Sequence, residues 1–368
     1  MNPRELFRVA IVSLTAFVPI WAGADDSAEQ RAAVAMPSSQ EQASSAEGTV
    51  RLPAIDVPLS SYRSPQARQN IIQSLKHPYP TPKGSIDVPG PIVDAWRREF
   101  DTNIFPQRIK ALRAQYPVTL EGRTVGGVYT EVIAPKDGVL PRNEHRVLIN
   151  LHGGGFVMGA RLGGQTESIP VASVARIKVV SVDYRLAPEH KFPAASEDVA
   201  AVYRELLKSY KPENIGIFGS SAGGLLAAQS VAWFQKEKLP RPGAIGILCA
   251  SAAGRWEGDS EHLWIPGGVD HVGPYLKDAE LSDPLVAPFW STQVLAEFPA
   301  TLIMTSTRAF DLSAAVETDL RLTKVGVQSE LHVWDGLGHC MFGNAGTPEA
   351  ADATAIMAKF FDRHLGRE

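Results

Sequence analysis

A serine flanked by glycines has sequence neighbours that suggest a catalytic role. The stretch 219–224 reads Gly-Ser-Ser-Ala-Gly-Gly, with Ser221 inside it. It follows a short apolar segment of strand length, residues 214–218, and precedes an apolar, helix-like run, residues 225–234. Glycines on either side of a serine let a strand and a helix pass close together and lift the serine out of the turn. The pattern predicts Ser221 as a nucleophile near the positive end of a helix, with an ordinary tight turn as the alternative.

A run of glycines follows another predicted strand. His152-Gly153-Gly154-Gly155-Phe156 comes directly after the apolar residues 147–151. Consecutive glycines leave backbone N–H groups unshielded and able to converge on one oxygen atom. Acyl transfer needs such donors, because its carbonyl oxygen becomes an anion in the intermediate. The run therefore predicts an oxyanion-binding loop, and a flexible turn is the weaker alternative.

His339 is the predicted general base. A serine hydroxyl is a poor nucleophile until a neutral imidazole takes its proton. Among the nine histidines, His339 alone lies in a glycine-flanked loop just past the final predicted strand, where it could face Ser221. His152 is predicted to be a structural hydrogen-bonding residue, and His364 a solvated residue of the last helix.

Asp311 is the predicted acid, which would orient the imidazole and stabilise its cation. It follows the predicted strand at residues 301–304, in the chain order Ser, Asp, His. Two other carboxylates compete for this role. Asp335, four residues before His339, is expected to point away from the imidazole, and Asp319 is expected to lie too far back on the next helix.

The segments that must position these residues alternate between strand and helix patterns. Continuous short apolar runs are typical of strands buried on both faces of a parallel sheet. They occur at residues 147–151, 179–182, 215–218, 244–248, 301–304 and 331–334, with an alternating edge strand at 128–133. Helical periodicity separates most of them, so the sequence predicts an α/β fold, a mostly parallel sheet covered by helices on both faces.

The N-terminal third is expected to lie outside this sheet. A basic start, an apolar run and an Ala-Gly-Ala end predict a signal peptide at residues 1–24, and hence an exported, periplasmic or secreted protein; an uncleaved anchor is the alternative. Residues 25–49 lack aromatic residues and are expected to form a flexible linker. Residues 50–117 contain helical patterns at 65–76 and 91–116, the latter broken near Pro106, and are interpreted as a helical cap or brace.

A second irregular segment interrupts the predicted core, which comprises residues 118–253 and 291–368. Residues 254–290 are rich in proline and aromatic residues, including Trp256, Trp264 and Tyr275. Such an insertion after a sheet strand is interpreted as part of a cap or substrate wall, with a long connection as the alternative.

Composition narrows the function classes. The net charge of −4 shows no basic bias, so a nucleic-acid partner is not expected. No zinc-type cysteine cluster or phosphate-binding Gly-Lys-Ser/Thr motif occurs, and no metal or cofactor site is predicted. The two cysteines, Cys249 and Cys340, are too few for a disulfide framework, and their state is left open. No membrane partner is expected once the signal peptide is removed, and a homodimer is compatible with the sequence.

Three motifs together resemble one family, the bacterial hormone-sensitive-lipase-like esterases of the α/β-hydrolases. The resemblance covers roughly residues 118–365. It implies the α/β-hydrolase fold with a helical cap, Ser221 as nucleophile, His339 as base and Asp311 as acid. It also implies an oxyanion hole built from the N–H groups of Gly154, Gly155 and Ala222, with Gly153 shaping the loop. The three motifs are the runs 152–156 (His-Gly-Gly-Gly-Phe), 183–190 (Asp-Tyr-Arg-Leu-Ala-Pro-Glu-His) and 219–224.

Two positions depart from the family pattern. Ser220 stands where the family often has aspartate before the nucleophile, and this is interpreted as a structural variation. The acid of the family often opens an Asp-Pro-Leu turn, whereas this chain has Asp311-Leu312-Ser313, and some members place the acid at the position of Ala309.

The resulting functional prediction is a serine hydrolase of small carboxylic esters with short or medium acyl groups, acting through an acyl-enzyme. Deacetylation of a sugar ester and hydrolysis of a lactone or an amide are alternatives that use the same residues. A non-catalytic ligand-binding relative is the alternative from a different functional class, since some members of the family are receptors that have lost the histidine.

Overall fold

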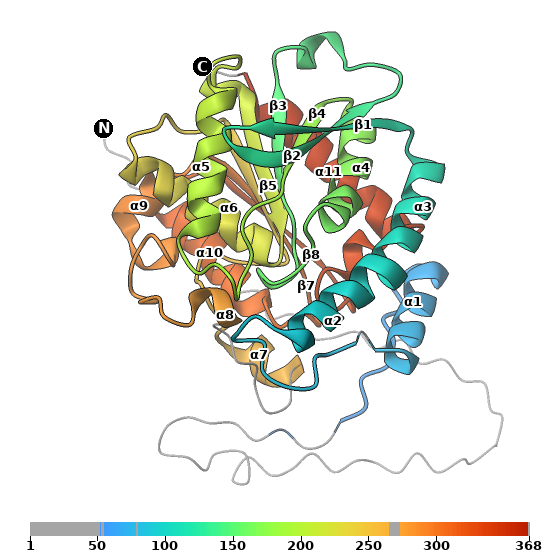
Figure 1. The fold of residues 1–368 in the computed structure, drawn as a ribbon. Coiled ribbons are helices and arrows are strands. Elements are labelled where there is room, and N and C mark those ends of the chain that lie inside the picture. The colour runs from blue at the N-terminus through green and yellow to red at the C-terminus, as the bar shows by residue number, and fades with distance from the viewer. Residues whose placement is uncertain (1–51, 53–54, 79, 265–272, 367–368) are drawn as a thin grey trace, which may run out of the picture. The chain divides into compact units, whose positions relative to one another are not determined.

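The computed structural model describes residues 52, 55–78, 80–264 and 273–366 (Figure 1). The contacts discussed below lie within the unit Pro58–Glu368. The predicted signal peptide at 1–24 and linker at 25–49 lie outside the described residues, as do residues 265–272 of the predicted insertion. In the part of the chain that is described, no helix combines the length and apolarity that a bilayer span requires.

An eight-stranded sheet forms the centre of the fold, in the order β1-β2-β4-β3-β5-β6-β7-β8. β1 and β2 form an antiparallel hairpin, β2 runs antiparallel to β4, and all other neighbouring pairs are parallel. The strands are β1 (Val118–Val125), β2 (Val128–Pro135), β3 (Val147–Leu151), β4 (Lys178–Val182), β5 (Ile215–Ser220), β6 (Ala244–Leu248), β7 (Ala300–Ser306) and β8 (Ser329–Trp334). The predicted α/β-hydrolase fold is therefore confirmed.

Alternate residues of the buried strands enter two different apolar layers. Ile149 and Ile217 pack with helices α5 (Ala194–Leu206), α6 (Ala222–Lys236) and α10 (Leu312–Lys324). Leu148 and Phe218 pack on the opposite side, against helices of the other layer, α4 (Leu162–Ala175) and α11 (Pro348–His364). Because both faces are covered, these strands lack the polar alternation of a half-exposed sheet, as the sequence pattern indicated.

The sequence pattern did not predict β1. Most of its residues are exposed, and its sequence, Val-Thr-Leu-Glu-Gly-Arg-Thr-Val, has no continuous apolar run. An edge strand that buries little surface is held by its backbone ladder to β2, which leaves a weak signal in residue types.

The N-terminal helices pack on the core (Figure 1). α1 (Pro65–Lys76) contacts α11, and α3 (Phe105–Gln115) contacts α4. α2 (Pro91–Glu99) continues through a π-helical turn, Phe100–Ile104, into α3, whose second residue is Pro106. Proline has no N–H to continue the regular ladder, and the helical run passes the predicted break as this π-helical turn, without an interruption.

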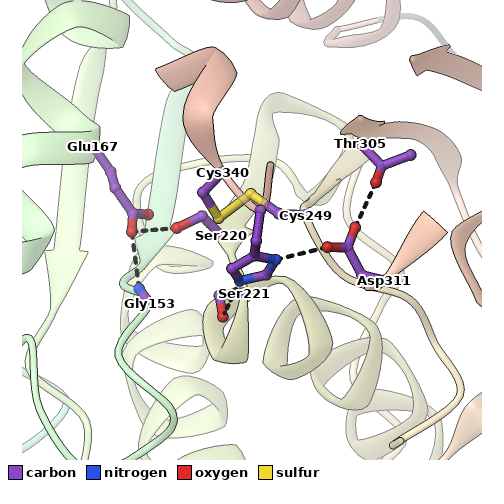
Figure 2. The surroundings of a disulfide bond; sticks show 9 residues. Gly153, Glu167, Ser220, Ser221, Cys249, Thr305, Asp311 and Cys340 are labelled. Carbon is purple, nitrogen blue, oxygen red and sulfur yellow. Dashed lines mark hydrogen bonds and ion pairs between the residues drawn. A yellow bond between two sulfur atoms is a disulfide. The ribbon is translucent and has the colours of Figure 1, made fainter. Parts of the chain in front are cut away.

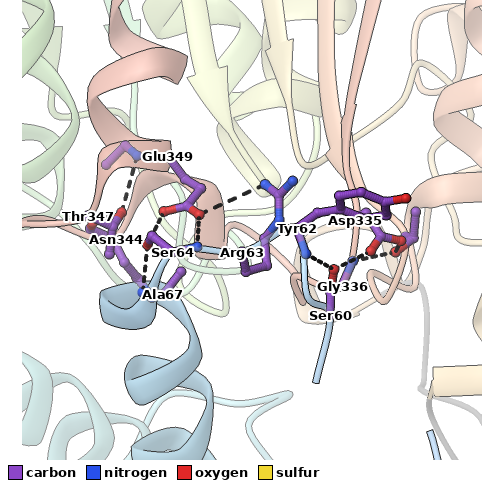
Figure 3. A network of polar contacts seen from close by, with 12 residues as sticks. Ser60, Tyr62, Arg63, Ser64, Ala67, Asp335, Gly336, Asn344, Thr347 and Glu349 are labelled. Atoms are coloured by element: carbon purple, nitrogen blue, oxygen red, sulfur yellow. Dashed lines mark hydrogen bonds and ion pairs between the residues drawn. The ribbon is translucent and has the colours of Figure 1, made fainter. Parts of the chain in front are cut away.

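Two polar contacts fix this N-terminal region to the core. The Arg97 guanidinium of α2 donates two hydrogen bonds of 2.7 Å to the Glu189 carboxylate and one to the Ala187 carbonyl. Before α1, the Ser64 N–H and hydroxyl donate to the Glu349 carboxylate at 2.8 and 2.7 Å (Figure 3). Ser64 therefore lies against the first turn of α11. The N-cap of α11, Thr347, accepts from the Ala350 N–H.

The segment between β6 and β7 has little regular structure. Its described elements are α7 (Asp259–Trp264), α8 (Gly273–Leu276), a 3₁₀ turn (Pro288–Trp290) and α9 (Thr292–Ala296). A 3₁₀ turn is also present at Pro141–Asn143, at Pro212–Asn214 and at Met341–Gly343.

Candidate active site

Ser221 lies on a sharp turn between β5 and α6. Its backbone has a φ of 53°, in the left-handed region that residues with a side chain rarely adopt. The turn depends on glycine at two positions: a Cβ at Gly219 would lie 2.3 Å from the Leu151 carbonyl oxygen, and one at Gly223 would lie 1.8 Å from that same oxygen. The Ser221 N–H donates to the Leu248 carbonyl at 2.8 Å, which fixes the turn to the end of β6.

Three side chains from separate loops form a hydrogen-bonded chain. His339 Nε2 lies 3.0 Å from Ser221 Oγ, and His339 Nδ1 lies 2.6 Å from Asp311 Oδ1 (Figure 2). Asp311 is fully buried, and its other oxygen accepts from the Thr305 hydroxyl at 2.5 Å. An ionised Asp311 requires the proton on Nδ1, which leaves Nε2 free to accept the Ser221 proton.

The competing carboxylates lie elsewhere. Asp335 accepts from the Ser60 hydroxyl at 2.5 Å and from the Thr307 hydroxyl at 3.3 Å. Asp319 accepts from the Ser329 hydroxyl at 2.6 Å. The structure thus brings Asp311, and neither Asp319 nor Asp335, to His339.

Aromatic rings surround the imidazole. The Phe310 ring stacks on His339 with 4.3 Å between centroids, and Trp256 meets both rings edge-on. Trp264 Nε1 donates to the Thr307 carbonyl at 2.9 Å. Trp256 and Trp264 belong to the aromatic insertion, so this segment lies beside the predicted catalytic loop.

The glycine loop after β3 presents unpaired donors near Ser221. Gly154 and Gly155 have φ values of 117° and 62°, and among the described residues no protein group accepts from the N–H of either. Ala222 opens α6, and the first N–H groups of a helix have no partner within it. Gly153 differs, because its N–H donates to Glu167 at 2.8 Å. The Gly153 N–H therefore ties the loop to α4.

Two other histidines, His152 and His364, make contacts that do not include Ser221. His152 is buried and stacked on Tyr184, and loss of hydration lowers its pKa to about 4. The prediction that His364 is solvated is wrong: it is half-buried and lies 3.4 Å from Glu330, with its ring against Phe360. It occupies the last turn of α11, where that helix packs on the core.

Cys249 and Cys340 form a disulfide bond. Cys249 directly follows β6, whose last carbonyl binds the Ser221 N–H, and Cys340 directly follows His339 (Figure 2). The bond therefore links the histidine loop to the strand end that supports the serine turn. Residue types gave no signal for this pairing, because the two cysteines lie 91 residues apart.

Removal of this disulfide is expected to impair catalysis and stability together. The double variant C249A/C340A should show a kcat lowered by about tenfold, because small displacements of a catalytic group are costly. The free energy of unfolding should fall by about 2–4 kcal/mol. The measurement is ester hydrolysis and thermal melting of both proteins with and without a phosphine reductant.

The reductant provides the control. It should lower the kcat and the melting temperature of the wild type as the double substitution does, and it should have no effect on the double variant. A wild type with two titratable thiols after reduction, yet unchanged kcat and melting temperature, would contradict this prediction.

Sequence reasoning also missed two polar residues around the site. Thr305 binds the second oxygen of Asp311, and Glu167, on α4, binds the glycine loop and the serine turn. Neither belongs to a motif, and both become visible only when the fold brings distant segments together. In the described part of the chain, no group of three or more His, Cys, Asp or Glu residues is arranged to hold a metal ion.

Comparisons with known proteins agree with this geometry. Residues 148–343 match the family model of the α/β-hydrolase fold. The chain is 28% identical over 229 residues to an esterase of Acinetobacter venetianus, covering 58% of this chain and 74% of that protein.

Solved structures give the same result. The crystal structure of an esterase matches with a TM-score of 0.73 and 30% identity, covering 86% of this chain and 99% of that one. An esterase from the bacterial hormone-sensitive lipase family matches with a TM-score of 0.69 and 26% identity, over 82% and 99% of the two chains. The chain therefore belongs to the α/β-hydrolase fold family and, within it, to the esterases related to the bacterial hormone-sensitive lipase family.

Proposed function

We propose that this esterase hydrolyses small carboxylic esters through an acyl-enzyme on Ser221. The observation that carries the proposal is the continuous chain of contacts from Ser221 Oγ to His339 and from His339 to buried Asp311. The N–H groups of Gly154, Gly155 and Ala222 support it, because they have no acceptor among the described residues and can supply donors for an oxyanion.

The residues would act in two half-reactions. Ser221 Oγ bonds to the ester carbonyl carbon while its proton passes to His339 Nε2, and the carbonyl oxygen becomes an anion held by the loop N–H groups. Collapse of this intermediate breaks the bond to the alcohol, which leaves with the proton from His339. A water molecule then repeats the sequence on the acyl-enzyme and releases the carboxylic acid.

The aromatic residues near His339 favour short acyl groups over long ones. Trp256 and Phe310 occupy the space beside the imidazole, and Tyr275 stacks on Phe156, the residue that follows the oxyanion loop. We expect the rings of Trp256 and Phe310 beside the imidazole to limit the width available to an acyl chain. Sugar-ester deacetylation and lactone or amide hydrolysis would use the same groups, and no contact among the described residues favours them.

A series of p-nitrophenyl esters from acetyl to palmitoyl tests this preference. We expect kcat/KM to be highest between acetyl and hexanoyl, and to fall at least about tenfold by palmitoyl, because each poorly accommodated part of a substrate loses binding energy in the transition state. Trp256→Ala should move the optimum toward longer chains.

Trp290→Ala is the matched control. Trp290 is exposed and lies against Phe289, without a contact to the triad. Its variant should keep the wild-type profile. Activity that rises steadily to palmitoyl, with activation on triglyceride emulsions, would contradict the preference for short chains.

A further inference from the structure

A single carboxylate joins the oxyanion loop to the serine turn. Glu167 Oε1 accepts from the Gly153 N–H at 2.8 Å and from the Ser220 hydroxyl at 2.5 Å (Figure 2). Its Oε2 accepts from the Asn150 side-chain amide at 2.9 Å. Gly153 is adjacent to Gly154, one of the proposed oxyanion donors, and Ser220 is adjacent to Ser221. Glu167 therefore contacts both halves of the site from a helix, α4, that carries none of the proposed catalytic groups.

Removal of the Glu167 carboxylate from water is unfavourable in free energy. Among the described residues, no lysine or arginine forms an ion pair with Glu167. Loss of hydration raises the pKa of Glu167 to about 6, and hydrogen bonds from Ser220, Gly153 and Asn150 offset that effect only in part. A carboxyl group held in such surroundings is more common at functional sites than in ordinary packing.

The glycine loop needs an external support of this kind. Gly154 and Gly155 have no side chains to fix them, and both adopt positive φ angles. The orientation of their N–H groups is set by the peptide planes on either side. On the N-terminal side, the Gly153 carbonyl, which shares a peptide plane with the Gly154 N–H, lies 2.8 Å from His152 Nδ1, and the Gly153 N–H in the preceding peptide plane is bound to Glu167.

We propose that Glu167 is a positioning residue, whose carboxylate holds the Gly153–Gly155 loop against the serine turn so that the loop N–H groups face the oxyanion. The inference rests on the proposed function of Ser221 and extends it to a residue outside the three motifs. It also gives Ser220 a role: its hydroxyl supplies the turn with a donor to this carboxylate.

Removal of the Glu167 carboxylate should weaken binding of the transition state more than binding of the substrate. Glu167→Ala is expected to lower kcat by about 10²-fold, comparable to the loss of one oxyanion donor, and to change KM by less than about threefold. A second readout is the affinity for butylboronic acid. Ser221 Oγ bonds to boron, its proton passes to His339, and the boron becomes a tetrahedral anion with an oxygen at the oxyanion position. This affinity should fall by about the same factor as kcat.

Glu167→Gln is the conservative variant. The Gln carbonyl oxygen retains an acceptor for Gly153 and Ser220. Its NH₂ group would face Asn150, whose Oδ1 now accepts from the Ser181 hydroxyl at 3.0 Å. Rotation of the Asn150 amide by half a turn lets its oxygen accept from Gln and its NH₂ donate to Ser181, so the network can be satisfied in the opposite sense. This variant should stay within about fivefold of wild-type kcat, since neutral hydrogen bonds are weaker than charge-assisted ones.

Glu349→Ala is the matched control for general destabilisation. Glu349 also accepts one backbone N–H and one serine hydroxyl, both from Ser64, and none of its contacts involves the triad or the glycine loop (Figure 3). It should lower the melting temperature without lowering the boronic acid affinity.

The outcomes separate the alternatives. Glu167→Ala could lower the melting temperature and leave kcat and boronic acid affinity unchanged, as Glu349→Ala should. In that case Glu167 would be a structural residue only. Equal impairment of the Gln and Ala variants would also overturn the proposal, because an acceptor alone would then be insufficient. If Ser221→Ala retains activity, it is the proposed function that fails, whatever the Glu167 variants show.

Discussion

Replacement of Ser221 by alanine is expected to lower the hydrolysis of an activated ester by on the order of 10⁶-fold, as in serine proteases that lose their nucleophile. The fold should be unaffected, because alanine has the same Cβ and the turn is held by backbone contacts, including the Ser221 N–H to Leu248 bond. The Ser221 hydroxyl is hydrogen-bonded to His339. In the alanine variant this bond is lost, but His339 keeps its hydrogen bond to Asp311. The measurement is p-nitrophenyl butyrate hydrolysis alongside thermal melting.

Ser230→Ala provides a matched control on the same helix. Ser230 is fully buried in α6, and its hydroxyl donates to the Leu226 carbonyl at 2.7 Å, away from the triad. Its variant should keep wild-type kcat. Retention of even a tenth of the activity by Ser221→Ala, after contamination by host esterases is excluded, would contradict a serine mechanism.

Elements buried in the sheet were well predicted from the sequence. β3 and β6 have the predicted bounds, and β4, β5 and β7 extend the predicted runs by a few residues. A strand covered on both faces must be apolar along its length, so its residue types report its environment directly. The serine turn is similarly constrained, since its glycines cannot carry a Cβ without meeting the Leu151 carbonyl.

Two contacts between segments far apart in the chain were not predicted. Glu167 reaches Ser220 across 53 positions, and Cys249 reaches Cys340 across 91. Each partner has an ordinary sequence context, and the pairing arises from strand order, which residue types alone do not specify. β1 was missed for a different reason: an exposed edge strand buries too little surface to require an apolar pattern.

Asp311→Asn tests the acid of the triad, for which the sequence alone left Asp319 and Asp335 as competitors. We expect kcat to fall by at least about 10²-fold at neutral pH, and up to about 10⁴-fold, the loss known for an orienting acid in serine proteases. The reason lies in the two contacts of the buried carboxylate. The introduced asparagine could offer its oxygen to His339 and its NH₂ to Thr305, which keeps the tautomer but removes the charge that stabilises the imidazolium. In the opposite orientation its NH₂ would face Nδ1, so that the ring proton moves to Nε2 and His339 can no longer accept from Ser221.

Asp319→Asn and Asp335→Asn are the matched controls, because each makes the same change in charge and almost none in volume. The Asp319 carboxylate accepts from Ser329, and the Asp335 carboxylate accepts from Ser60 and Thr307. Neither substitution therefore alters a contact of the imidazole. Both should remain within about threefold of wild-type kcat, as expected for groups that do not interact with the transition state. Near-normal kcat in Asp311→Asn together with a large loss in either control would reassign the acid. Because Asp311 is the carboxylate that lies within hydrogen-bonding distance of His339 Nδ1, such a result would also require the histidine loop to rearrange before catalysis.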